Sequence, residues 1–370
     1  MEAQFKTWVT EYEEILQLLD QIDPVAYGKT RNYIDGHVTR LSPYISRGVL
    51  STKQVLEHIL EMGHPFERIE KFVQELAWRD YWQQVWKEKG DSIFSDLKHK
   101  QPKGKFVGMP RAIDEANTGI DAIDRAIKEM YDTGYMHNHV RMYVASIATN
   151  MAECKWQDPA QWMYYHLLDG DLASNHLSWQ WVAGSNSNKT YVANQDNINK
   201  YCHTEQKGNF LDVPYENFSN WEVPEILKEL MPAAFNTDLP VCEELKVDDN
   251  IPTLIYNEYN LDPLWHNEMP ANRILLFEPE VYRRFPVSQH RIQFALDLAK
   301  NIEGLQVYSG SFQTLEQELK GGKVIFKEHP LYEYDGKKEE RDWMFDVEGY
   351  FPSFFAFWKK AKKQLIKVEA

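Results

Sequence analysis

The spacing of apolar residues changes near residue 253, and this change limits the folds that the chain can adopt. Over about the first 200 residues, apolar positions recur three and four residues apart, which is the period of an amphipathic helix. After residue 253 they instead form short runs suited to buried strands, at residues 253–256, 273–277, 304–308 and 323–326. Helical stretches separate some of these runs, and strands alternating with helices indicate a parallel sheet covered by helices.

We therefore predict an α + α/β chain, with an all-helical domain first and a smaller Rossmann-like α/β domain second. The expected boundaries are residues 1–205 for the helical domain, 206–252 for an irregular, proline-rich connector, and 253–370 for the α/β domain. Ser51 has the character of an N-cap for a helix over residues 53–60. Further helices are expected over residues 287–301 and 312–319, and an aromatic, then basic, helix over 352–367.

Composition narrows the classes of protein to which the chain can belong. Of its 370 residues, 43% are hydrophobic and 12 are tryptophan, which indicates a well-buried globular protein rich in flat side chains. The three cysteines lack CxxC spacing, so neither a disulfide scaffold nor a four-cysteine metal site is expected. Without a membrane-length apolar run or a signal-like start, we expect a cytoplasmic protein with no membrane partner and no metal. The net charge of −15 argues against non-specific adhesion to nucleic acid, although it leaves room for a local basic patch.

Residues 169–181 are an unusual combination of side chains. Asp169 and Asp171 lie two residues apart, Asn175 follows, and Trp179 and Trp181 flank a glutamine. Indoles offer large flat surfaces with one N–H donor, which suits stacking against a planar ligand. The alternative is structural, with the acids capping a helix and the tryptophans filling a core.

Three other blocks carry polar groups at functional spacings. Residues 39–51 place hydroxyls and a guanidinium around a turn that can bind phosphate oxygens, or that is only a Ser-Pro turn before a capped helix. Glu75, Trp78 and Arg79 share one helix face, although a Glu–Arg pair at this spacing is usually a solvated one. Residues 138, 141 and 142 share another face. His137 and His139 diverge on a helix and do not predict a metal site.

Together, the blocks at residues 39–51, 72–82, 118–142 and 156–181 resemble the photolyase/cryptochrome family of light-driven flavoproteins, in order and in spacing. The resemblance implies a photolyase-type helical domain that binds FAD. Its turn at 38–42 matches the one that holds the FAD pyrophosphate, Arg141 and Asp169 match an ion pair beside the flavin ring, and Asn175 matches the residue facing N5. The cofactor-binding positions that it implies are Tyr27, Val38, Thr39, Arg40, Leu41, Ser42, Arg79, Asn138, Arg141, Asp169, Asp171 and Asn175.

The resemblance also implies a substrate and an electron path. The residues that match those holding a flipped pyrimidine dimer in cyclobutane-dimer photolyases are Glu75, Trp78, Asn138, Met142 and Trp181. Two indoles can sandwich splayed bases, and a damaged pair costs less to unstack than an intact one. Trp156 and Trp179 match the middle and proximal members of an electron-transfer tryptophan triad.

Four departures from the family pattern stand out. His139 replaces an arginine, and residues 176–178 read His-Leu-Ser where Asn-Gly-Gly is usual. The distal tryptophan of the triad should fall near Lys103, yet none lies between Trp86 and Trp156. The domain order looks permuted, because the part that resembles the antenna-binding α/β domain comes second. Whether that part binds an antenna chromophore is left open.

The sequence thus predicts a monomeric, FAD-dependent, blue-light-driven DNA photolyase that repairs pyrimidine dimers by electron transfer from reduced flavin. The main alternative is a cryptochrome-like photoreceptor with little or no repair activity and a signalling partner, which the acidic composition and the altered residues 176–178 favour. A non-photoactive flavoprotein or scaffold on the same fold is a third possibility.

Overall fold

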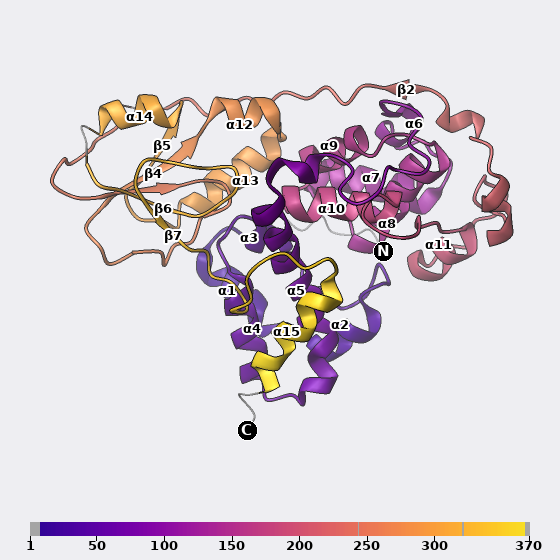
Figure 1. The fold of residues 1–370 in the computed structure, drawn as a ribbon, viewed down its shortest axis with the longest axis horizontal. Helices are drawn as coiled ribbons and strands as arrows, with labels where there is room; N and C mark the ends of the chain where they lie inside the picture. The colour runs from indigo at the N-terminus through magenta and orange to yellow at the C-terminus, as the bar shows by residue number, and fades with distance from the viewer. Residues whose placement is uncertain (1–7, 243, 320–321, 367–370) are drawn as a thin grey trace. The chain divides into compact units, whose positions relative to one another are not determined.

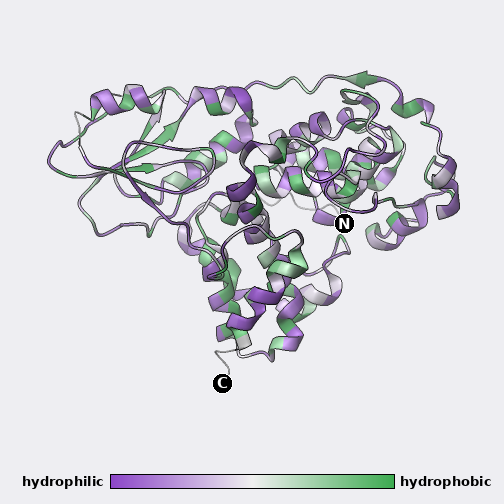
Figure 2. Cartoon of the chain, viewed as in Figure 1, coloured by the Kyte–Doolittle hydropathy of each residue, from purple (hydrophilic) through white to green (hydrophobic). Residues whose placement is uncertain are grey.

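The computed structural model describes residues 8–242, 244–319 and 322–366, which form two compact units. Within the described ranges, unit 1 comprises residues 25–38 and 89–235, and unit 2 comprises residues 8–24, 39–88 and 236–366. Helices of both units combine hydrophilic and hydrophobic residues on the same element, as amphipathic packing requires (Figure 2). None of the helices in the described ranges is long and apolar enough to cross a bilayer.

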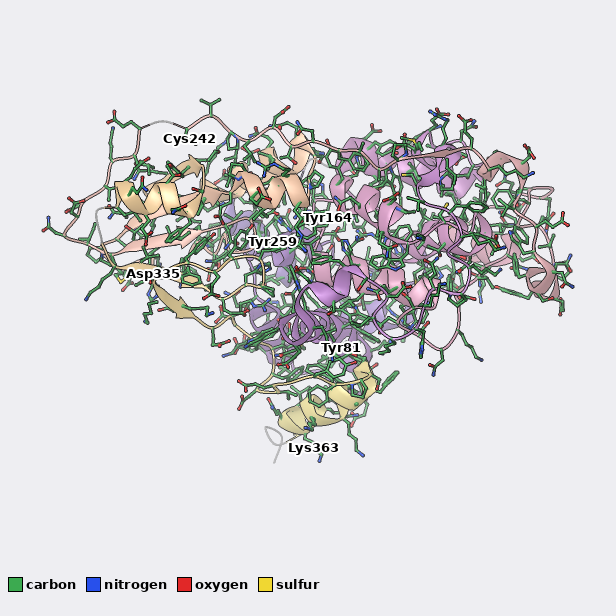
Figure 3. All side chains as sticks on the ribbon, turned by 45° about the horizontal axis from the view of Figure 1, so that its top comes forward. Tyr81, Tyr164, Cys242, Tyr259, Asp335 and Lys363 are labelled. Atoms are coloured by element: carbon green, nitrogen blue, oxygen red, sulfur yellow. The ribbon has the colours of Figure 1, made fainter. Side chains whose placement is uncertain are left out.

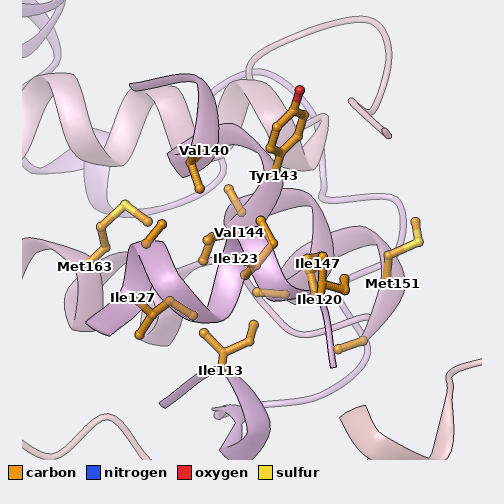
Figure 4. Close-up of a cluster of buried hydrophobic side chains, with 14 of the residues drawn as sticks. Ile113, Ile120, Ile123, Ile127, Val140, Tyr143, Val144, Ile147, Met151 and Met163 are labelled. Carbon is orange, nitrogen blue, oxygen red and sulfur yellow. The ribbon is translucent and has the colours of Figure 1, made fainter. Parts of the chain in front are cut away.

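Unit 1 is helical (Figure 1). Its helices are most of α2 (Pro24–Thr30), then η1 (Gly90–Phe94), α6 (Arg111–Asp114), α7 (Asp121–Thr133), α8 (Asn138–Ser146), the π-helix η2 (Ile147–Met151), α9 (Gln157–His166), α10 (Leu172–Ala183), α11 (Gln195–Cys202), η3 (Tyr215–Asn220) and η4 (Glu225–Leu227). Strands β1 (Met109–Pro110) and β2 (Leu230–Met231) pair antiparallel. Isoleucines of α7 and the apolar face of α8 and η2 meet in one buried core, which confirms the period read from the sequence (Figure 4).

Unit 2 contains the α/β part of the chain. Its helices are α1 (Tyr12–Asp20), α3 (Ser42–Ser46), α4 (Thr52–Glu61), α5 (Phe66–Lys89), α12 (Pro279–Arg284), α13 (Gln289–Ala299), α14 (Phe312–Glu318) and α15 (Phe354–Ile366). Its strands are β3 (Thr253–Tyr256), β4 (Asn272–Phe277), β5 (Leu305–Ser309), β6 (Val324–Lys327) and β7 (Lys337–Glu339). In the described residues they form a five-stranded sheet of order β5-β4-β3-β6-β7 with every pairing parallel. The predicted fold class is confirmed.

Local expectations also hold closely. The four predicted strands form within one residue of their expected bounds, and Ser51 caps α4 with a full capping box to Gln54. The predicted helix over 352–367 begins at Phe354, and its expected last residue lies outside the described residues. Strand β7 was not predicted, because three charged residues in a row carry no apolar signal.

The compact units group the chain differently from the boundaries at 205 and 252, because Thr39–Glu88 belongs with the α/β part. A buried ion cluster explains this grouping. Glu258, just after β3, accepts hydrogen bonds from Arg47 at 2.6 Å and from Arg291 at 3.0 Å to each oxygen, and all three side chains are at most 1% exposed. The Arg47 guanidinium also lies 4.8 Å from the centre of the Tyr259 ring (Tyr259 is labelled in Figure 3).

Gly48 allows the backbone after α3 to reach that cluster. Its φ is +65°, and an added Cβ would lie 2.3 Å from the carbonyl oxygen of Tyr259. Next to it, the Arg47 carbonyl accepts a hydrogen bond from the Leu261 amide at 2.9 Å. A side chain at position 48 would therefore push these two segments of unit 2 apart.

Candidate functional site

An ion pair at the start of α8 organises the polar residues of unit 1. Arg141 Nη2 donates to Asp169 Oδ2 at 2.9 Å, and Arg141 Nε donates to the Met136 carbonyl at 2.8 Å. The pair is not sealed, since Arg141 is 20% exposed while Asp169 is 4% exposed. The resemblance anticipated this pairing, and the structure forms it.

A glycine allows the segment before Asp169 to approach α8. Gly134 ends α7 with φ +70°, and an added Cβ would lie 2.4 Å from Leu168 Cγ. The Gly134 carbonyl accepts a hydrogen bond from the Leu168 amide at 2.9 Å. This close approach brings Asp169 within reach of Arg141.

Asp171 and Asn175 have structural partners at the start of α10. Asp171 is the N-cap, and its Oδ1 accepts a hydrogen bond from the Ser174 amide at 2.7 Å. Asn175 Nδ2 donates to the Ala160 carbonyl of α9 at 2.8 Å. Asp171 thus has the capping role that the structural alternative gave to the acids, and a role of Asp171 or Asn175 beside a flavin remains a prediction.

The polar groups around Arg141 fit a planar, polar ligand such as a flavin. Two hydrogen bonds engage only Nε and Nη2 of Arg141, although its guanidinium has five N–H donors. A group with carbonyl and ring-nitrogen acceptors would use such donors. Arg141, Asp169 and Asn175 are the residues that would hold the flavin ring, and the flavin would supply the light-driven redox chemistry.

The predicted lesion-binding residues of unit 1 are accessible. Asn138 is exposed at the first turn of α8, and Met142 lies one turn further along, half-buried. The Trp181 indole is 39% exposed on α10, with Tyr191 packed at 6.0 Å between ring centres. These three side chains can contact a partner without rearrangement.

Trp156 and Trp179 are interior residues. They are 0% and 2% exposed and belong to the same buried cluster. Between α9 and α10, His176 contacts the Trp156 ring edge-on at 5.7 Å and the Tyr164 ring at 6.3 Å (Tyr164 is labelled in Figure 3). Burial lowers the pKa of His176 to about 4, so the imidazole is neutral at pH 7. Its Nδ1 lies 3.0 Å from the Leu172 carbonyl, which places the proton on that nitrogen.

In unit 2, the turn at residues 39–42 has the conformation that binds anions. Arg40 has φ +55°, and Leu41 returns to the right-handed region. Successive residues of opposite hand aim their amides to one side, which is how backbone nests hold phosphate oxygens. Thr39 Oγ1 accepts a hydrogen bond from the Leu41 amide at 3.3 Å. Ser42 begins α3, while Val38 and the half-buried Tyr27 on α2 lie in unit 1.

The α5 residues named from the sequence have partners in unit 2. Glu75 pairs with Lys71 at 2.6 Å, and not with Arg79, which donates to Ser46 Oγ at 2.8 Å. The Phe354 ring of α15 stacks on the Trp78 indole, with ring centres 3.9 Å apart and planes 10° apart. One face of Trp78 is thus covered, which the sequence did not predict. The lesion-binding role of Glu75 and Trp78 remains a prediction.

The sequence did not predict a role for Phe354 or Asp96, although both contact candidate site residues. Phe354 belongs to an aromatic run whose docking on α5 spans 276 positions, and no periodicity reports so distant a contact. Asp96 bonds the Trp156 indole across 60 positions, from a loop without a recognisable motif. Over the described ranges, no group of three or more His, Cys, Asp or Glu side chains is placed to hold a metal ion.

Comparison with known families identifies the larger part of the helical region. Residues 72–231 match the family described as the FAD binding domain of DNA photolyase. This segment is similar to the FAD-binding domain of DNA photolyases. The match includes the Arg141–Asp169 pair, both interior tryptophans and Trp181. It excludes the turn at residues 39–42 and the α/β part of the chain.

Individual proteins are similar to parts of this chain. The chain is 33% identical over 166 residues to a deoxyribodipyrimidine photo-lyase from Streptomyces griseus, covering 43% of this chain and 36% of the relative. It is 30% identical over 210 residues to a cryptochrome DASH from Danio rerio, covering 54% and 38%. A solved cryptochrome from Synechocystis sp. PCC6803 aligns at 22% identity with a TM-score of 0.46, over 53% of this chain and 44% of that one. The chain thus spans little more than a third of the length of these curated relatives.

Proposed function

We propose that this protein is an FAD-dependent, light-driven DNA photolyase that acts on pyrimidine dimers. The observation that carries the proposal is the Arg141–Asp169 pair, whose guanidinium is partly exposed, within a segment that matches the photolyase FAD-binding domain. Relatives named deoxyribodipyrimidine photo-lyase support the same activity. Bound flavin would supply the electron that splits the dimer.

The chain's own residues would bind and orient the two reactants. Arg141 donates to flavin acceptors while Asp169 holds its guanidinium in place. Asn138 can bond base edges, and the exposed face of Trp181 can stack on a flipped base, because base–aromatic stacking tolerates any sequence. Asn138, Met142 and Trp181 are all at least partly accessible in unit 1, as binding to a flipped base requires.

The decisive experiment measures repair directly. Purified protein should show flavin absorption bands, and the reduced protein under blue light should lower the dimer content of UV-irradiated oligothymidine, measured by chromatography. A dark sample is the control. Flavin-loaded protein that leaves the dimer content unchanged in the light would contradict the proposal.

The stack of Phe354 on Trp78 favours a second candidate, a cryptochrome-like photoreceptor. Such a protein needs flavin photoreduction but no lesion pocket, so covering one face of Trp78 would not impair its function. It would show light-driven flavin reduction together with weak binding to damaged oligothymidine.

A further inference from the structure

The buried indole of Trp156 is bonded to a carboxylate at the surface. Its Nε1 donates to Asp96 Oδ1 at 2.9 Å. The Trp156 side chain is 0% exposed, whereas Asp96 is exposed. The polar atom of a core tryptophan is therefore connected to solvent through one acidic side chain.

The loop that carries Asp96 is fixed by a small hydrogen-bond network. Asp96 Oδ2 accepts from the Gln101 amide at 2.9 Å, and Gln101 Oε1 accepts from the Trp156 amide at 3.1 Å. Gln101 Nε2 donates to the Cys154 carbonyl at 2.8 Å. These backbone and side-chain hydrogen bonds thus hold the Asp96 carboxylate at a fixed position beside the Trp156 indole. A surface acid that met the indole by chance would lack such support.

The same loop occupies the place where a distal tryptophan was expected. Lys103 lies there with its ammonium 3.4 Å from the Asn150 carbonyl, and the sequence has no tryptophan from position 87 to 155. An electron vacancy on Trp156 therefore has no indole in this segment to which it can move. An acidic acceptor is present instead.

Loss of one electron changes the chemistry of an indole. The oxidised ring is a cation, which a water-excluded core disfavours, and its N–H becomes a strong acid. The neighbouring imidazole of His176 is neutral and brings no further positive charge. A carboxylate at hydrogen-bond distance is in position to take the proton.

We propose that Asp96 is the proton acceptor for Trp156 and that this proton transfer ends the electron path inside unit 1. The inference rests on the proposed flavin photochemistry. Bound oxidised flavin would supply the light-driven oxidant, and Trp179 and Trp156 would pass one electron to it, which leaves the electron vacancy on Trp156. The Nε1–H bond of Trp156 then breaks, its proton forms an O–H bond on Asp96 and leaves to water, and a neutral tryptophan radical remains. A thiol added as reductant returns the hydrogen atom to Trp156 and becomes a thiyl radical, two of which couple to a disulfide.

The test follows this radical in the flavin-loaded protein after a light pulse. By transient absorption, wild-type protein should convert the tryptophan radical cation to the neutral radical, more slowly in D₂O. Asp96→Asn keeps size and polarity but not basicity, and should slow the conversion about 100-fold, the usual contribution of a positioned proton acceptor. Asp132→Asn, which changes an exposed acid of the same unit, is the matched control and should behave as wild type.

Further readouts separate the possible failures. In cofactor-free protein, the indole N–H resonance of Trp156 should differ between wild type and Asp96→Asn, because the group that accepts its hydrogen bond changes from a carboxylate to an amide. If that variant fails to fold, wild type alone should show radical deprotonation that slows as the pH is lowered, because a carboxylic acid cannot accept the proton. Unchanged radical kinetics in Asp96→Asn, or no pH response in wild type, overturns the assignment. Absence of flavin from the wild-type protein would instead overturn the proposed function.

Discussion

The two units differ in how far they bury an arginine–carboxylate pair and a tryptophan ring. In unit 2, Glu258 is sealed between two arginines, and Trp78 has one face covered by Phe354. In unit 1, the Arg141–Asp169 pair keeps a partly exposed guanidinium, and Trp181 is 39% exposed. A charge or ring that is fully enclosed contributes to the fold, whereas one left accessible is available to a ligand. Residue type alone does not separate these roles.

The largest loss of stability should come from removing the carboxylate of the buried Glu258 cluster. Glu258→Ala leaves Arg47 and Arg291 buried without their carboxylate, so we expect the free energy of unfolding to fall by about 3–5 kcal/mol. Denaturant unfolding followed by circular dichroism measures this change. Glu225→Ala, which removes an exposed partner of Lys228, is the control and should have little effect. Equal effects of the two variants would remove the distinction between sealed and exposed pairs.

His176 is a buried titratable residue of unit 1, and its contribution to the stability of the fold depends on pH. Its pKa is about 4 when folded and about 6.5 when unfolded, so the unfolded state binds the proton more tightly. Stability should therefore fall as pH drops from about 6.5 to about 4, by about 3 kcal/mol from this group. His176→Asn should lose less stability than wild type over that range in urea unfolding. His99→Asn, at an exposed position, should match wild type, and identical slopes for all three proteins would contradict the assignment.

The accessible pair should affect ligand binding more than folding. If Arg141 holds the flavin as proposed, Arg141→Leu removes charged hydrogen bonds worth about 1.5–3 kcal/mol, which is roughly a 10- to 100-fold loss of FAD affinity. Flavin fluorescence titration measures the affinity, and unfolding of cofactor-free protein should change less than in Glu258→Ala. Arg111→Leu, from an exposed pair in the same unit, is the control. Unchanged FAD affinity would show that the pair is structural, like its counterpart in unit 2.

The smallest expected effect comes from replacing the Phe354 ring, which covers one face of Trp78. Phe354→Leu keeps an apolar side chain but loses the aromatic stack, worth about 0.5–1.5 kcal/mol. If Trp78 binds the lesion, the variant should bind UV-irradiated oligothymidine about two- to tenfold more tightly by fluorescence anisotropy. Phe355→Leu, at the 68% exposed neighbour, is the control. Unchanged binding would remove Trp78 from the lesion site and favour the photoreceptor.

The sequence predicted what is encoded locally. Four strands of the sheet, the Ser51 cap and the helical period of α8 depend on residues close along the chain, and the structure forms them. The Arg141–Asp169 pair was anticipated only through the family resemblance, since 28 positions separate its members. The Arg47–Glu258 bond and the Phe354 stack join positions more than 200 apart, where burial and packing decide the partners. No spacing rule reports such contacts.

The strand that the sequence missed has a consequence for association between molecules. β7 closes one side of the sheet with Lys337, Lys338 and Glu339, and the first two are exposed. At the opposite edge, Gln306 of β5 exchanges side-chain hydrogen bonds with the Lys246 backbone, which holds the connector against that strand. Charge at one border and a covering segment at the other discourage a neighbouring chain from adding a strand. The sheet is thereby protected against growth into an aggregate.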